Sequence, residues 1–218
     1  GDQRTDGCED DSRTLLEVGI GSGILSILLL KQGKFDQVTG TDINPCAIAC
    51  ARDNMQRLGL ESRVNLLHAD LFPPVPSHPT TNSTNGEMGY DAVLFNPPWL
   101  PGDAPTCLDQ AVYDPNQMIL RRFVHEVQHY VKKEDGCIYI LLSNLGMLLG
   151  LFREQDLHAM FVEGNLELVE VYHHHTHPTK STNSMGDDQQ KQHKLNDIAN
   201  TRAREVISLY KLRVKRSR

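Results

Sequence analysis

The sequence lacks both a long apolar run and an organised set of cysteines. Its longest apolar stretch, residues 141–152, is interrupted by Ser143 and Asn144, and a bilayer-spanning helix needs roughly 20 apolar residues. The five cysteines are odd in number, scattered, and form no Cys-x-x-Cys pair, which argues against a disulfide framework and a zinc site. These absences predict a protein of the cytoplasm or another reducing intracellular compartment, with no membrane segment and with its cysteines as small core thiols.

The chain also lacks a strong excess of charge of either sign. It carries 22 Lys and Arg against 28 Asp and Glu, a formal net charge of −6. A mildly acidic protein does not capture nucleic acid by its overall charge, although the last residues are locally basic. With 218 residues, 39% of them apolar, the chain is long enough for one domain with a full core.

The order of the apolar segments predicts the fold class. Five expected strands alternate with helices, and two further strands follow with only a loop between them, which predicts parallel strands first and an antiparallel pair last. The predicted fold is therefore α/β, a Rossmann-like doubly wound seven-stranded sheet, mostly parallel with an antiparallel final strand pair. The expected strands are 14–18, 37–43, 63–68, 90–95, 137–142, 166–172 and 205–212, and the expected helices are 24–32, 45–58, 115–131 and 150–162.

Two polar segments interrupt this pattern. Residues 73–89 are rich in Pro, Ser, Thr and Asn, and residues 173–201 are rich in His, Thr, Asn, Gln and Asp, so both predict mobile insertions. The expected strands and helices together predict one domain over residues 14–212. It is flanked by a flexible N-terminus (1–13) and a basic tail (213–218). The second insertion holds His173, His174, His175 and His177 without a second ligand cluster nearby, so we expect no metal site.

A glycine turn follows the first expected strand. Gly19, Gly21 and Gly23 let the backbone approach a ligand closely, and the next helix offers free N–H donors. Asp42 ends the second expected strand, where a carboxylate can accept hydrogen bonds from both ribose hydroxyls. The spacing is Gly-x-Gly-x-Gly and lacks the later third glycine of the dinucleotide pattern. This spacing favours a nucleoside ligand without phosphates over a nicotinamide dinucleotide. A nicotinamide-dependent oxidoreductase is therefore the weaker alternative.

A second motif, Asn96-Pro97-Pro98-Trp99, follows the fourth expected strand. Proline fixes its own φ and keeps the preceding residue extended. The Asn96 side-chain amide and the Pro97 carbonyl are thereby presented beyond a strand end, next to the only tryptophan of the chain.

Taken in order, four motifs resemble those of class I S-adenosylmethionine-dependent methyltransferases. They are Glu17-Val18-Gly19-Ile20-Gly21-Ser22-Gly23, Asp42, His68-Ala69-Asp70 and Asn96-Pro97-Pro98-Trp99. The last of them resembles the branch that carries Asn-Pro-Pro and an aromatic residue, which includes the HemK-like glutamine methyltransferases and the small-domain methyltransferases of RNA and DNA.

This resemblance implies that the chain is an enzyme with S-adenosyl-L-methionine as its cofactor. It implies that Gly19, Gly21 and Gly23 pack under the methionine and ribose, and that Glu17 reaches the methionine amino group. Asp42 would hold the ribose hydroxyls and Ile43 would flank the adenine. Asp70 would accept from the adenine amine, with Leu71 supplying backbone and an apolar edge.

The catalytic residues implied are Asn96, Pro97, Pro98 and Trp99. An amide or aromatic amine nitrogen has its lone pair delocalised into a planar system. Hydrogen bonds from its N–H groups to the Asn96 oxygen and the Pro97 carbonyl would hold it in line with the methyl group and stabilise the growing positive charge. Trp99 would stack on the planar group, which is worth about 1–3 kcal/mol for a base. The predicted reaction is methyl transfer to a planar nitrogen.

The carrier of that nitrogen stays open between two macromolecules. Trp99 and the basic tail favour the exocyclic amine of a nucleobase in RNA. The acidic composition favours the alternative, the glutamine side-chain amide of a protein, although HemK-like enzymes usually have Tyr at the position of Trp99. Because only a short segment precedes the first strand, we expect substrate choice to involve a partner subunit or an upstream recognition domain. A non-catalytic scaffold subunit of the same fold is the alternative of another class.

Overall fold

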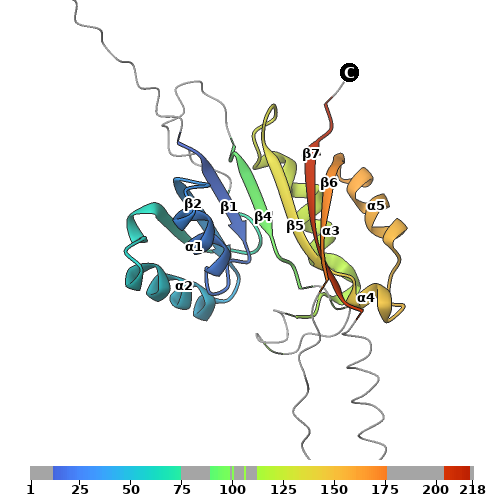
Figure 1. Cartoon of the computed structure of the whole chain (residues 1–218), viewed down its shortest axis with the longest axis horizontal. Coiled ribbons are helices and arrows are strands. Elements are labelled where there is room, and N and C mark those ends of the chain that lie inside the picture. The colour runs from blue at the N-terminus through green and yellow to red at the C-terminus, as the bar shows by residue number, and fades with distance from the viewer. Residues whose placement is uncertain are drawn as a thin grey trace, which may run out of the picture. The chain divides into compact units, whose positions relative to one another are not determined.

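The computed structural model describes residues 12–74, 89–98, 100, 106, 112–175 and 204–216. Seven strands form one mixed sheet in the order β3-β2-β1-β4-β5-β7-β6 (Figure 1), as predicted for the fold class. The chain divides into two compact units, one of Gly1–Phe95 with Val127–Ile138 and the other of Asn96–Glu126 with Tyr139–Arg218.

The first unit holds four parallel strands. They are β1 (Thr14–Val18), β2 (Gln37–Asp42), β3 (Val64–His68) and β4 (Ala92–Phe95). All four residues of β4 are buried and so are the last four of β1, as expected of central parallel strands covered on both faces. The register places Val18 opposite Thr41 and Phe95, so β1, β2 and β4 end at one edge of the sheet.

Helices follow β1 and β2 at that edge. Helix α1 (Ile24–Lys31) begins after the glycine turn, and α2 (Pro45–Arg57) begins at Asn44, whose side chain accepts a hydrogen bond of 2.9 Å from the Cys46 N–H. Asparagine is favoured at the N-cap and proline at the first helical position, which explains why the helix begins here.

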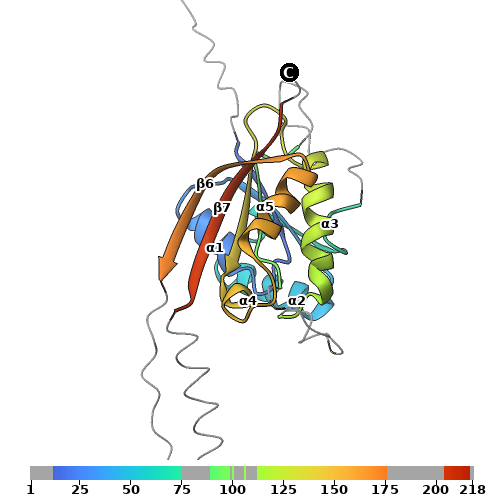
Figure 2. The ribbon, with the colours of Figure 1, turned by 90° about the vertical axis from the view of Figure 1, so that its right-hand side faces the viewer.

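The second unit contains most of β5 (Cys137–Ser143) and all of β6 (Leu166–His175) and β7 (Val206–Val214), the last two paired antiparallel. Its helices are α3 (Met118–Glu126), α4 (Leu145–Leu148) and α5 (Glu154–Glu163). Figure 2 shows the long β6–β7 pair beside α5. A short 3-10 turn, η3 (Pro115–Gln117), precedes α3, and another, η4 (Val127–His129), follows it in the first unit; a third, η1 (Glu61–Arg63), precedes β3.

Several predicted boundaries were wrong. Strand β6 continues through His175, so His173, His174 and His175 are not part of an insertion. They pair with Ser208, Ile207 and Val206 of β7, and His173 Nδ1 lies 2.8 Å from the Ser208 hydroxyl. Strand β7 in turn includes Arg213 and Val214, which were assigned to the basic tail.

The helices differ from the prediction in two places. The segment 115–131 is not one helix but η3, α3 and η4, and α4 lies before the predicted start of the helix at 150. Residues 75–88 and 176–203, the greater part of the two predicted insertions, lie outside the described residues, as do residues 1–11 and 217–218 of the two predicted flanking segments.

The cysteines of α2 were expected in the core and are not there. The buried face of α2 consists of Ile48, Ala51 and Met55, which recur at helical spacing. Cys46 and Cys50 fall on the other side of the helix and are exposed. In the part of the chain that the structure describes, no helix is long and apolar enough to cross a membrane.

Candidate active site

The glycine turn adopts a conformation that favours glycine at three positions. Gly19, Gly21 and Gly23 have φ values of 66°, 56° and 78°, in the left-handed region where a side chain is strained. A Cβ on Gly21 would meet no atom within 4 Å, whereas one on Gly23 would lie 2.9 Å from Met55 Cε. The turn is therefore packed against α2 at Gly23 and open at Gly21, as a cradle for a ligand must be.

Asp42 ties this turn to the end of β2. Its Oδ2 accepts a hydrogen bond of 2.9 Å from the Gly21 N–H, and its Oδ1 accepts one of 2.8 Å from the Asn44 N–H. A carboxylate oxygen has capacity for more than one hydrogen bond, and the side chain is half-buried. Asp42 can therefore accept from a ligand as well as from the backbone.

Glu17 lies in β1 and is only 3% exposed. One of its oxygens, Oε2, accepts hydrogen bonds from the Ser26 N–H (3.1 Å) and from the Ser26 hydroxyl. Burial raises the pKa of the Glu17 carboxyl to about 7; the Ser26 hydrogen bonds oppose this rise and the negative charge of Asp42 adds to it. The site thus contains a carboxyl group that titrates near neutral pH.

The remaining predicted cofactor residues flank the same edge of the sheet. Ile43 is 53% exposed, and its carbonyl lies 2.9 Å from His68 Nε2. Asp70 is exposed. Leu71 is buried with a φ of 61°, and its carbonyl accepts a hydrogen bond from the Thr41 hydroxyl. Of these three residues, Leu71 therefore packs its side chain inside the protein, whereas Asp70 and Ile43 present theirs to solvent.

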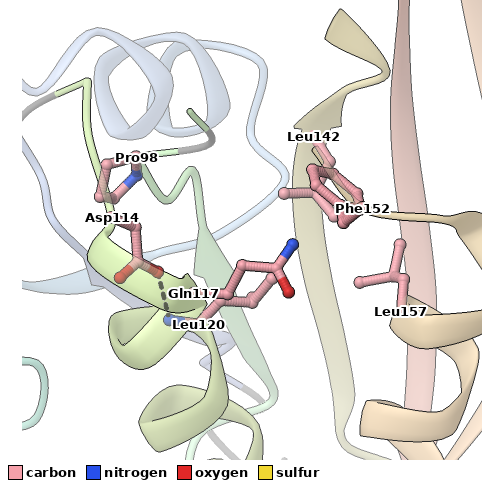
Figure 3. Close-up of a pocket in the computed structure, with 7 residues that line it drawn as sticks. All are labelled: Pro98, Asp114, Gln117, Leu120, Leu142, Phe152 and Leu157. Atoms are coloured by element: carbon pink, nitrogen blue, oxygen red, sulfur yellow. Dashed lines mark hydrogen bonds between the residues drawn. The ribbon is translucent and has the colours of Figure 1, made fainter. Parts of the chain in front are cut away.

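The acceptor motif begins where β4 ends. Asn96 is exposed, Pro97 is buried and Pro98 is half-buried, so a rigid and packed segment presents the Asn96 amide. Pro98 lines a small pocket of the second unit (Figure 3). Trp99 lies outside the described residues. The other residues of the pocket are Asp114, Gln117, Leu120, Leu142, Phe152 and Leu157.

Three residues of these sites were not predicted as functional. Ser26 carried no signal beyond its place in the first turn of α1. Asp114 comes directly before Pro115, as a helix cap would, and it accepts hydrogen bonds from the Ile119 (2.9 Å) and Leu120 (3.0 Å) N–H groups. Nothing in the sequence pointed to Gln117, because its place in the pocket follows from an unusual backbone conformation.

Among the described residues, no group of three or more His, Cys, Asp or Glu side chains could hold a metal ion.

Comparisons with known proteins identify the family of the chain. The family described as "Methyltransferase small domain" matches residues 8–142. A Methanocaldococcus jannaschii protein whose name assigns it provisionally as a protein N5-glutamine methyltransferase is 31% identical over 140 residues, which are 62% of this chain and 64% of that protein. A release factor glutamine methyltransferase of Moorella thermoacetica is 34% identical over 99 residues, 45% of this chain and 31% of its own.

The solved structures show the same fold at low identity. A geranyl diphosphate C-methyltransferase from Streptomyces coelicolor A3(2) has a TM-score of 0.58 at 10% sequence identity, over 92% of this chain and 73% of that one. The chain spans less than two thirds of the curated relatives named above. The family match itself covers more than half of the chain. It confirms the resemblance drawn from the four motifs: the chain belongs to the methyltransferase small domain family.

Proposed function

We propose that this protein is an S-adenosylmethionine-dependent N-methyltransferase that methylates the side-chain amide of glutamine in a protein substrate. The observation that carries the proposal is the order of the motifs on the strand ends. An open glycine turn follows β1, the Asp42 carboxylate ends β2, and the exposed Asn96, followed by the buried Pro97 and the half-buried Pro98, comes after β4.

The residues of the first unit fit the cofactor. The space above Gly21 has no protein atom within 4 Å of a Cβ built there, so the ligand can approach the backbone. Asp42 is placed to accept from ribose hydroxyls, the exposed Ile43 to cover the adenine, and the exposed Asp70 to accept from its amine. Glu17 would hold the methionine ammonium group, directly or through water.

The bound cofactor supplies a methyl group on a positively charged sulfur, whose leaving group is a neutral thioether. No acid is needed to expel it, so the protein has to act on the nucleophile. The Asn96 side-chain oxygen and the Pro97 carbonyl would accept hydrogen bonds from the two N–H groups of the acceptor. Both oxygens would stabilise positive charge as it develops on nitrogen. The N–C bond would form as the S–C bond breaks, and the nitrogen would release one proton to solvent water.

The comparisons favour a protein over a nucleobase as the acceptor. The sequence favoured an RNA base because of Trp99 and the basic tail. The relatives that match this chain carry the names of glutamine methyltransferases, and their named substrates are proteins such as release factors and a ribosomal protein. A glutamine amide and a nucleobase amine both present a planar NH₂ group, so the same two oxygens serve either. The net charge of −6 also suits a protein better than a polyanion.

The decisive experiment transfers a labelled methyl group to cell extract and then digests the products separately with protease and nuclease. The proposal expects the label to become soluble with protease alone, and acid hydrolysis of the labelled fraction to release labelled methylamine. Label released by nuclease would restore the RNA hypothesis. If calorimetry detected no binding of S-adenosylhomocysteine, the scaffold alternative would replace both.

A further inference from the structure

The pocket beside Pro98 contains a residue that the proposed reaction does not yet use. Gln117 extends its side-chain amide from η3 toward Leu142 and Phe152 (Figure 3). Apart from Asp114 on the opposite side, the other lining side chains are apolar. An amide in an otherwise apolar pocket next to a substrate-binding motif is the type of group that orients a ligand.

The backbone that presents this amide is strained. Asn116 and Gln117 have φ values of 56° and 57°, in the left-handed region that L residues rarely adopt. Asparagine tolerates this conformation better than glutamine does, because its short side chain can bond locally. Strained residues that persist in a fold cluster at ligand-binding and catalytic sites.

Asp114 keeps the strained turn in place. Its carboxylate is 2% exposed and accepts from the Ile119 and Leu120 N–H groups at the start of α3. Its carbonyl accepts from the Gln117 N–H at 3.1 Å. Asp114 thereby connects η3 to the start of α3, and its side chain is buried. The other polar residue that lines the pocket, Gln117, is only half-buried, so its amide is the polar group that a ligand can reach.

We propose that Gln117 is a specificity-determining residue whose amide hydrogen-bonds a main-chain amide of the acceptor polypeptide next to the acceptor glutamine. A glutamine amide can donate and accept at once, so it can pair with both the N–H and the C=O of a peptide group. Pro98 belongs both to this pocket and to the acceptor motif, which places the recognised residue beside the reacting one. The inference rests on the proposed function.

The test compares Gln117→Gly with Asn116→Gly. Both substitutions relieve a left-handed residue, but only the first removes an amide from the pocket. Acceptor is supplied as the protein fraction of a cell extract, and initial rates are measured against its concentration together with the melting temperature and the affinity for S-adenosylhomocysteine. We expect Gln117→Gly to keep or raise the melting temperature, to leave cofactor affinity unchanged, and to raise the half-saturating acceptor concentration about three- to tenfold, as the loss of one hydrogen bond implies. Asn116→Gly should change none of the acceptor parameters.

Two results would overturn the inference. One is a Gln117→Gly enzyme with wild-type half-saturation, which leaves the proposed function standing and removes only the role of Gln117. The other is equal loss of stability and activity in both variants, which would make η3 a purely structural turn. A wild-type enzyme that labels no protein at all would instead refute the proposed function. As a further check, Gln117→Asn should restore part of the affinity for acceptor because it keeps an amide at the pocket.

Discussion

Glu17→Gln is predicted to stabilise the protein in a pH-dependent manner. The pKa of the Glu17 carboxyl is raised from 4.5 to about 7 by burial, so the folded protein binds its proton more tightly than the unfolded chain does. Such a group contributes stability that is fully present below the unfolded pKa and is lost as the pH rises through 7. The folded and unfolded pKa values differ by about 2.5, and each pKa unit is worth 1.36 kcal/mol. Above pH 8, ionisation of Glu17 therefore lowers the free energy of unfolding by about 3 kcal/mol.

Glutamine has the size and the neutrality of the protonated glutamate, and its oxygen can still accept from Ser26. The variant should therefore match the wild type near pH 4.5 and exceed its free energy of unfolding by about 3 kcal/mol at pH 8.5. Urea titrations at pH 4.5, 6, 7 and 8.5 measure this, with the slope checked for constancy. Glu61→Gln, at an exposed position of η1, is the matched control and should show no such pH-dependent gain.

The same variant should bind cofactor more weakly, because the carboxylate that the ammonium needs is gone. For the wild type, affinity for S-adenosylhomocysteine should rise as the pH increases through 7 and Glu17 ionises, and the variant should lack this rise. A stability gain of the same size at all pH values would refute the reasoning, because a neutral substitution effect does not depend on the charge of Glu17. A wild-type affinity for S-adenosylhomocysteine that does not change between pH 6 and 8 would refute the role of the Glu17 carboxylate in binding.

Three further predictions concern single residues. Asp42→Ala should weaken S-adenosylhomocysteine binding by about 1–3 kcal/mol through loss of charged hydrogen bonds, measured by calorimetry, whereas a change below twofold would remove Asp42 from the site. Asn96→Ala should leave that affinity nearly unchanged and remove most methyl transfer, so near wild-type turnover would contradict the proposed mechanism. Asp114→Ala should lower the free energy of unfolding by about 0.5–2 kcal/mol, the usual cost of a lost helix cap; an unchanged urea midpoint would show that the two N–H groups find other partners.

The strand ends were predictable because short-range rules determine them. Glycines in a turn, Asn44-Pro45 at a helix start and Pro97-Pro98 after a buried strand each restrict the backbone locally. These rules placed β1, β2, β4 and the start of α2 within one or two residues. The family resemblance depended on the same positions, which is why it was available before the structure.

The errors arose where a distant partner decides the outcome. His173, His174 and His175 have no strand propensity to mark them, and they are strand only because β7 pairs with them. The exposure of Cys46 and Cys50 depends on which face of α2 packs against the sheet. In each case, contacts with another part of the chain decide the conformation or the exposure of the residue, and these contacts cannot be read from the local sequence.

The electrostatics of the first unit argue for a cationic ligand over a phosphorylated one. A dinucleotide would need the N–H groups of the glycine turn for its pyrophosphate, yet the Gly21 N–H is already donated to Asp42. The charge of Asp42 also raises the pKa of Glu17, so this end of the sheet disfavours additional negative charge. A ligand with an ammonium group would instead lower the pKa of Glu17 and recover part of the free energy that its burial costs. The carboxylates therefore favour the binding of a nucleoside that carries an amino acid, such as S-adenosylmethionine, over a nicotinamide dinucleotide. The glycine spacing alone gives weaker support for this distinction.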